Sequence, residues 1–141
     1  MEKQNSHNLT DLADLADLAD FLQDICKIIH KFNMLDNTPL GQGIFIKLFV
    51  HYFKHEQLSM KDLNADIEAG TSTIRPSTQI LQKHQWIAKE SSADDLRVQT
   101  IVPSKKLEKR LIDLATHSQA RILKYMNKKN NSTIINKDID M

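Results

Sequence analysis

The segment 70–89 contains no acidic residue, and its polar side chains are of types that recognise duplex DNA. An arginine can form a bidentate pair with guanine and a glutamine with adenine, whereas serine, threonine and lysine suit phosphate oxygens. Arg75, Gln79 and Lys83 share one face of a helical wheel, opposite an apolar face. An exposed helix that carries these side chains only for solvation has the same pattern. Whether this helix reads DNA or is simply solvated therefore depends on the neighbouring elements.

A second group of such residues follows at the tip of a predicted β-hairpin. Trp86-Ile87 and Val98–Val102 are strand-like runs on either side of a polar loop. The loop ends in Asp95-Leu96-Arg97, and an aspartate two residues before an arginine can brace the guanidinium as it reaches a minor groove or a phosphate. The alternative is a solvated surface ion pair.

The helix and the hairpin together supply a set of expected DNA contacts. Ser77 is included although the wheel places it on the inward face. The expected contacts are Ser72, Thr73, Arg75, Ser77, Gln79, Gln82, Lys83, Lys89, Asp95 and Arg97.

The elements that must position these residues are two short helices joined by a turn. Ser59 is expected to cap a helix over 60–69, and Gly70 to form the turn. The second helix is expected to end near His84. Pro76 falls in its first turn only when Thr73 is the cap, so we expect a late start. With a very short strand at 58–60 and the hairpin, this order predicts a helix-turn-helix followed by a β-ribbon, an arrangement that binds duplex DNA.

Two long amphipathic helices flank this region. The first is expected over 10–32, where three Asp-Leu-Ala triplets lead into apolar residues spaced by three and four. The last is expected over 104–127, with Leu107, Leu111 and Leu114 on its apolar face. Their apolar stripes are longer than a compact core can cover, which predicts a dimer interface.

The remaining segments complete the expected domain organisation. The segment 39–43 is expected to break the chain, and 44–54 to form a buried helix, although its β-branched and aromatic residues also allow a strand. We expect a flexible N-terminus, a single winged-helix domain and a disordered tail. These parts are residues 1–9, 10–127 and 128–141, with dimerisation helices at 10–36 and 104–127 and the DNA-binding winged helix at 58–103.

Composition and the absence of known motifs favour a single soluble domain and disfavour a membrane protein or an enzyme. The chain has 141 residues, 40% hydrophobic and 26% charged, with a net charge of +1, which is ordinary for one soluble domain. No apolar run reaches the roughly 20 residues of a membrane span, and no signal peptide is evident, so we expect a cytoplasmic protein without a membrane partner. No phosphate loop, nucleophile elbow or paired-carboxylate motif occurs. We expect no enzyme activity, no cofactor and no metal.

Two candidate sites are set aside at this stage. Cys26 adjoins the apolar stripe of the first long helix, which predicts a buried, inert thiol rather than an oxidation sensor. His51 and His55 lie four residues apart, but no further ligand pattern accompanies them beyond Glu56.

The order of residues through the hairpin resembles the winged-helix regulators of the multiple-antibiotic-resistance (MarR) family and the related staphylococcal accessory regulator (SarA) group. The matching order is Leu81, Gln82–Gln85, Trp86-Ile87, Asp95-Leu96-Arg97, Val98–Val102 and Ser104. Gln85 stands where a glycine is usual, Thr78 where a leucine is common, and Pro103-Ser104 where Leu-Thr is usual.

The resemblance implies a mainly α fold with a small β-wing, in which long terminal helices interlock two subunits. It implies a homodimeric transcriptional regulator that binds double-stranded DNA at a pseudo-palindromic operator. A small-molecule effector is possible, with no indication of its identity. The alternative is a winged-helix adaptor that binds proteins and does not touch DNA, which the near-neutral net charge keeps open.

Overall fold

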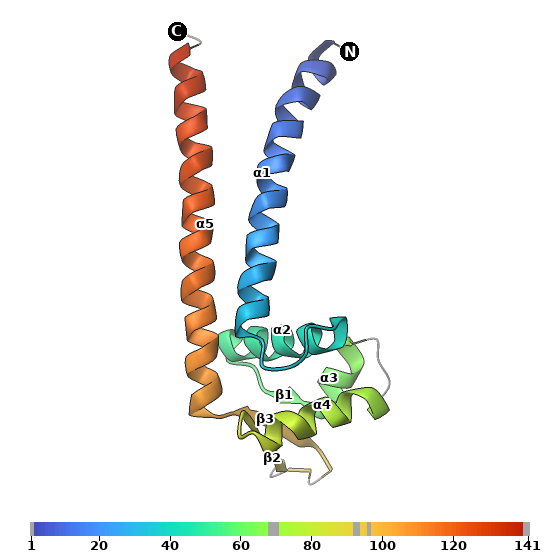
Figure 1. Ribbon diagram of the computed structural model, residues 1–141. Helices are drawn as coiled ribbons and strands as arrows, with labels where there is room; N and C mark the ends of the chain where they lie inside the picture. The colour runs from blue at the N-terminus through green and yellow to red at the C-terminus, as the bar shows by residue number, and fades with distance from the viewer. Residues whose placement is uncertain (1, 68–70, 92–93, 96, 140–141) are drawn as a thin grey trace. The chain divides into compact units, whose positions relative to one another are not determined.

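The chain folds into five helices and three strands within the part that the structure describes (Figure 1). The computed structural model describes the backbone of residues 2–67, 71–91, 94–95 and 97–139, and the side chains of 12–65, 67, 74–91, 94–95 and 97–131. The elements are α1 (Glu2–Phe32), α2 (Pro39–Lys54), β1 (Leu58–Ser59), α3 (Met60–Asp66), α4 (Thr71–Lys83), β2 (Ile87–Ser91), β3 (Gln99–Pro103) and α5 (Lys105–Ile139). They form two compact units, residues 29–114 and residues 1–28 with 115–141.

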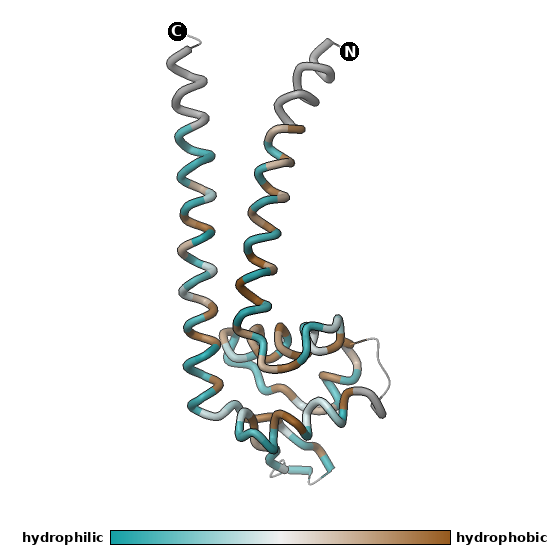
Figure 2. Tube along the Cα trace, viewed as in Figure 1, coloured by the Kyte–Doolittle hydropathy of each residue, from teal (hydrophilic) through white to brown (hydrophobic). Residues whose placement is uncertain are grey.

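The unit 29–114 is a winged helix. Its sheet has the order β1-β3-β2 with antiparallel pairing, and Lys89 of β2 lies opposite Ile101 of β3. The pairing of Leu58 with Ile101 confirms the short first strand. The apolar core comes from helices and strands alike: Ile44, Phe45, Leu48, Leu58, Leu63, Ile74, Leu81, Ile87, Ile101, Leu107, Leu111 and Leu114. Figure 2 shows that hydrophobic and hydrophilic residues alternate along the helices of this unit. The predicted fold class is therefore confirmed.

The segment 39–43 does not break the chain, contrary to expectation, because it forms the first turn of α2. Pro39 occupies the start of the helix, where a missing N–H costs no hydrogen bond. Thr38 is the N-cap, and its Oγ1 accepts a hydrogen bond from the Gly41 N–H at 3.1 Å. A side chain at Gly41 would overlap the Asp36 carbonyl, which explains a glycine inside a helix. The expected helix over 44–54 is thus the greater part of α2.

The helix-turn-helix has the expected first cap. Ser59 Oγ accepts from the Asp62 N–H at 3.0 Å, and the Asp62 carboxylate accepts from the Ser59 N–H at 3.3 Å. This reciprocal pair is a capping box. It lowers the pKa of Asp62, because both hydrogen bonds favour the carboxylate. The predicted turn at Gly70 lies outside the described residues.

The start of α4 differs from the prediction. The helix begins at Thr71, so Pro76 lies inside it rather than in its first turn. Proline has a helical φ but cannot donate to the carbonyl of residue 72, which costs one hydrogen bond. Burial of Ile74, Thr78 and Leu81 on the inward face offsets that cost.

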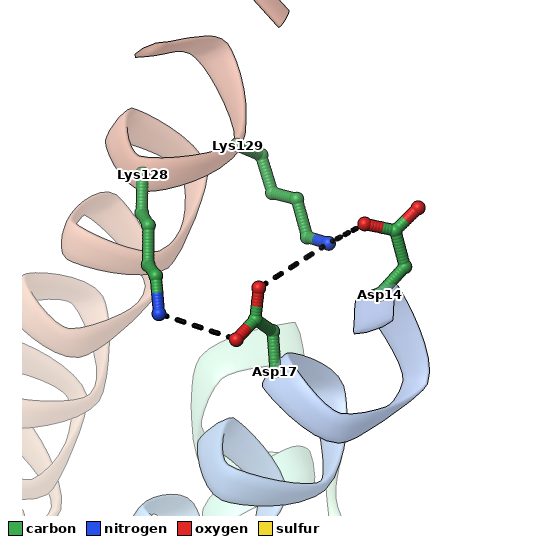
Figure 3. A network of polar contacts seen from close by, with 4 residues as sticks. All are labelled: Asp14, Asp17, Lys128 and Lys129. Carbon is green, nitrogen blue, oxygen red and sulfur yellow. Dashed lines mark hydrogen bonds and ion pairs between the residues drawn. The ribbon is translucent and has the colours of Figure 1, made fainter. Parts of the chain in front are cut away.

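The second unit pairs the N-terminal part of α1 with the C-terminal part of α5 in antiparallel fashion. Phe21 stacks on Tyr125 with ring centroids 4.7 Å apart. Arg121 Nε lies 2.7 Å from Asp24 Oδ2. Figure 3 shows the ion pairs nearest the chain ends, in which Lys128 contacts Asp17 and Lys129 contacts both Asp14 and Asp17.

Both chain ends are helical where flexible segments were expected. Helix α1 begins at Glu2 and α5 continues to Ile139. Once a helix is nucleated, each added residue gains one hydrogen bond for the two dihedral angles it fixes, so polar residues extend it readily. The exposed Cys26 is a second correction. A sequence stripe shows which side of a helix is apolar, but Cys26 lies beside that stripe rather than within it.

Candidate nucleic-acid interface

Helix α4 has one buried face and one exposed face. Ile74 and Thr78 are fully buried and Leu81 is 1% exposed, which fixes the helix against the winged-helix core. The exposed residues are Arg75, Pro76, Gln79, Ile80, Gln82 and Lys83, and Ser77 is half-buried at the edge. The side chains of Ser72 and Thr73 lie outside the described set. The exposed face therefore carries hydrogen-bonding and cationic groups and no acid.

Thr78 shows how a polar residue is accommodated at the place where the resemblance expects a leucine. Its Oγ1 donates a hydrogen bond to the Arg75 carbonyl at 2.9 Å. The buried hydroxyl is thereby satisfied within the helix. Thr78 is thus a core residue, and it leaves the neighbouring side chains of Arg75 and Gln79 exposed.

Helix α4 packs against strand β2, and this contact brings two basic residues together. Lys89 is half-buried on β2. Burial lowers the pKa of Lys89, and the nearby charge of Arg75 lowers it further. A phosphate placed between the two cations would oppose both effects, since an anion favours the charged form of lysine. Packing of α4 on β2 therefore places the charges of Arg75 and Lys89 near each other.

The hairpin tip holds the expected aspartate–arginine contact. Arg97 donates twice to Asp95 Oδ1, from its backbone N–H at 3.0 Å and from Nε at 3.3 Å. The Arg97 side chain is nevertheless 92% exposed. Such an exposed pair contributes little to stability. Its effect is to orient the guanidinium, whose remaining N–H groups are available to a ligand.

The base of the hairpin is held by a tryptophan and two cations. Lys106 Nζ lies 3.8 Å from the centroid of the Trp86 ring and donates to the His84 carbonyl. Arg110 lies on the same ring at 5.5 Å. Ser104 N–H donates to the Trp86 carbonyl, and Ser104 Oγ caps α5 by accepting from the Leu107 N–H. Lys106 was not among the expected contacts, and its only sequence signal was its position in the first turn of the last helix.

Gln85, where the resemblance expects a glycine, adopts the backbone conformation that glycine favours. Its φ is 61°, in the left-handed region. Its N–H donates to the Gln82 carbonyl, and the Trp86 N–H donates to the Leu81 carbonyl. These two bonds form a Schellman motif that ends α4. Gln85 thus forms the same turn from α4 into the hairpin that a glycine would form, but its side chain makes the left-handed backbone conformation strained.

Two other kinds of feature are absent from the described residues. Within them, no three histidine, cysteine or acidic side chains lie close enough to hold a metal ion. Across the same residues, no helix has the length and apolar character needed to cross a membrane.

The fold matches solved transcriptional regulators. No protein-family model matches the chain, and no curated protein does. YusO from Bacillus subtilis is 14% identical with a TM-score of 0.66, and the match covers 97% of this chain and 96% of YusO. AbsC, a MarR family transcriptional regulator from Streptomyces coelicolor, is 13% identical with a TM-score of 0.55 over 94% of this chain and 88% of AbsC.

A DNA complex is among the similar structures. MepR of S. aureus bound to DNA is 16% identical with a TM-score of 0.57, over 86% of this chain and 94% of MepR. These likenesses establish a MarR-like winged-helix fold.

Proposed function

We propose that the chain is a non-enzymatic transcriptional regulator that binds double-stranded DNA in a sequence-specific manner. The observation that carries the proposal is the exposed, acid-free face of α4, on which the charge of Arg75 lies near Lys89 of β2, together with the exposed Arg97 at the hairpin tip. In a helix-turn-helix this face enters the major groove. The MepR–DNA complex supports the same use of the fold.

Within this proposal the contacts divide by chemistry. Arg75 and Gln79 are suited to base edges, and alanine at either should cost about 1–3 kcal/mol on the operator. Lys83 and Lys89 are suited to phosphates, as are Ser72, Thr73, Ser77 and Gln82, and these contacts position the protein without specifying sequence. Asp95 and Arg97 add a contact from the hairpin.

We propose further that the regulator is a homodimer. Several large apolar side chains on α1 and α5 are exposed: Leu12 63%, Leu15 57%, Leu22 51%, Ile122 40%, Leu123 53% and Met126 52%. Apolar surface that recurs along two helices is typical of a subunit interface. A two-fold dimer would place two copies of α4 on half-sites about one helical turn, roughly 10 base pairs, apart.

The test is selection of bound duplexes from a library of fragments of the source genome, followed by binding across a salt series. We expect affinity to fall steeply with salt, because phosphate contacts release counterions. Selected fragments should share a pseudo-palindrome. If no duplex shows salt-dependent binding, the regulator proposal fails and the adaptor alternative replaces it.

A further inference from the structure

Two apolar residues lie on the exposed face of α4. Pro76 and Ile80 are four residues apart, so they are neighbours on the same side of the helix. Pro76 is exposed, and half of the Ile80 side chain is exposed. Gln79 and Lys83 lie beside them on the same face. We refer to Pro76 and Ile80 as the apolar strip of α4.

The apolar strip is not needed to attach α4 to the core. Ile74, Thr78 and Leu81 already fill the inward face with almost no exposed area. Pro76 even costs the helix a hydrogen bond, so stability of α4 does not explain its presence. A single exposed apolar side chain needs no explanation. A pair that adjoins Gln79 and Lys83 on the exposed face suits a partner that offers both polar and apolar groups.

The major groove of DNA offers such a mixture. Base edges present donors and acceptors to arginine and glutamine, phosphates pair with lysine, and the C5 methyl of thymine is the apolar group. From this correspondence we infer that Pro76 and Ile80 recognise thymine methyl groups in each half-site. The inference rests on the proposed DNA-binding function and adds a base preference to it.

The test replaces thymine by uracil in a duplex selected from genomic fragments, one position per half-site at a time. Uracil lacks only the C5 methyl and keeps the hydrogen-bonding edges. Wild-type protein should bind about fourfold more weakly at one or two positions, which corresponds to the burial of one methyl group. Ile80→Ala should bind the thymine and uracil duplexes equally at the position that Ile80 contacts. The ratio of the affinities for the thymine and uracil duplexes thus measures this one contact separately from overall affinity.

Three variants separate this contact from general effects. Ile46→Ala removes a comparably exposed isoleucine (44%) from α2 and should keep the wild-type ratio. Arg75→Ala should weaken binding to both duplexes and also keep the ratio. Pro76→Ala should reduce the ratio at a neighbouring thymine, while circular dichroism shows that α4 is retained.

The outcomes are distinct. Uracil that has no effect at any position, or an Ile80→Ala protein that keeps the wild-type ratio, overturns the inference while leaving DNA binding intact. In that case the apolar strip suits a protein partner instead. Absence of binding to every duplex overturns the proposed function and this inference together.

Discussion

Two residues of the winged-helix unit hold strained backbone conformations at the ends of helices. Gln85 ends α4 with φ 61°, and His55 ends α2 with φ 55°. The hydrogen bonds at His55 repeat those at Gln85, from His55 to Tyr52 and from Glu56 to His51. Both helices therefore end in a Schellman motif with a side chain where glycine is usual. Two helices of this unit thus end in the same left-handed turn without a glycine.

The strain at Gln85 leads to a stability prediction. The left-handed conformation costs a non-glycine residue about 1–2 kcal/mol. Glycine avoids this cost, but its greater freedom in the unfolded chain offsets about 0.4–1 kcal/mol of the benefit. Gln85→Gly should therefore stabilise the protein by about 0.5–1 kcal/mol in urea unfolding. Gln82→Gly is the matched control, because Gln82 is helical and glycine there should destabilise by about 1 kcal/mol. Equal losses at both positions would contradict the prediction.

The hairpin tip gives a prediction about DNA contacts at the same scale. If Arg97 reaches phosphate or the minor groove, Arg97→Ala should weaken binding to operator and scrambled duplexes alike. The slope of log affinity against log salt should become shallower by about one. Asp95→Ala should act in the same direction more weakly, because Asp95 orients the guanidinium. A loss confined to the operator would mean that Arg97 contacts a base edge.

At the scale of elements, the pairing of α1 with α5 is electrostatic as well as apolar. The hydrogen bond from Arg121 holds the pKa of Asp24 below its ordinary value of 3.8. Contact with Asp14 raises the pKa of Lys129 above its ordinary value of 10.5. The carboxylate contributes stability above its unfolded pKa, and the ammonium contributes below its unfolded pKa. Both contributions are present together across neutral pH.

The lowered pKa of Asp24 predicts how stability changes at acidic pH. Asp24→Asn should lower the free energy of unfolding at neutral pH by a small amount, because the Asp24 side chain is 43% exposed and solvent screens its charge. The difference from wild type should shrink as pH falls below 3.8 towards the lowered pKa of the folded state. Asp20→Asn removes the same charge from the same helix as a control. A difference that stays constant from neutral pH to pH about 2 would show that the Arg121 contact is not formed.

The exposed apolar residues of α1 and α5 also belong to the scale of elements, because they set the proposed dimer. Light scattering at micromolar concentration should give twice the chain mass of 16.2 kDa. Leu22→Asp should give the monomer mass or unfold the protein, because a carboxylate would enter an apolar interface. Ile46→Asp places the same charge on α2 and should remain dimeric. A monomeric wild type would contradict the dimer proposal and leave the proposed DNA-binding function untouched.

At the scale of the whole molecule, local signals were predictable and long-range ones were not. The cap at Ser59, the start of the last helix near Ser104 and the hairpin were predicted from the sequence because each depends on residues a few positions apart. The helical end of α5 was missed because Lys129 pairs with Asp14, which is remote in sequence. The exposure of Cys26 depends on which faces of the helices meet, and periodicity alone does not specify that.

The candidate site divides in the same way. Sequence placed Arg75, Gln79 and Lys83 on one face of α4, and the structure exposes all three. The proximity of Arg75 to Lys89 arises from packing of α4 on β2 and could not be derived from spacing. The full length of α4 was also missed, because proline was expected only in the first turn.

The pairing of β1 with β3 has a consequence for the order in which the protein folds. Leu58 pairs with Ile101, so α3, α4 and β2 all lie between the two partners in the chain. The β2–β3 hairpin closes a short loop, whereas β1 must wait for a distant strand, and distant contacts form slowly. During synthesis the helix-turn-helix emerges from the ribosome before β3, and β1 has no partner until β3 follows. The last strand of the wing therefore completes the sheet, and the proposed DNA-binding surface becomes whole late in the life of the nascent chain.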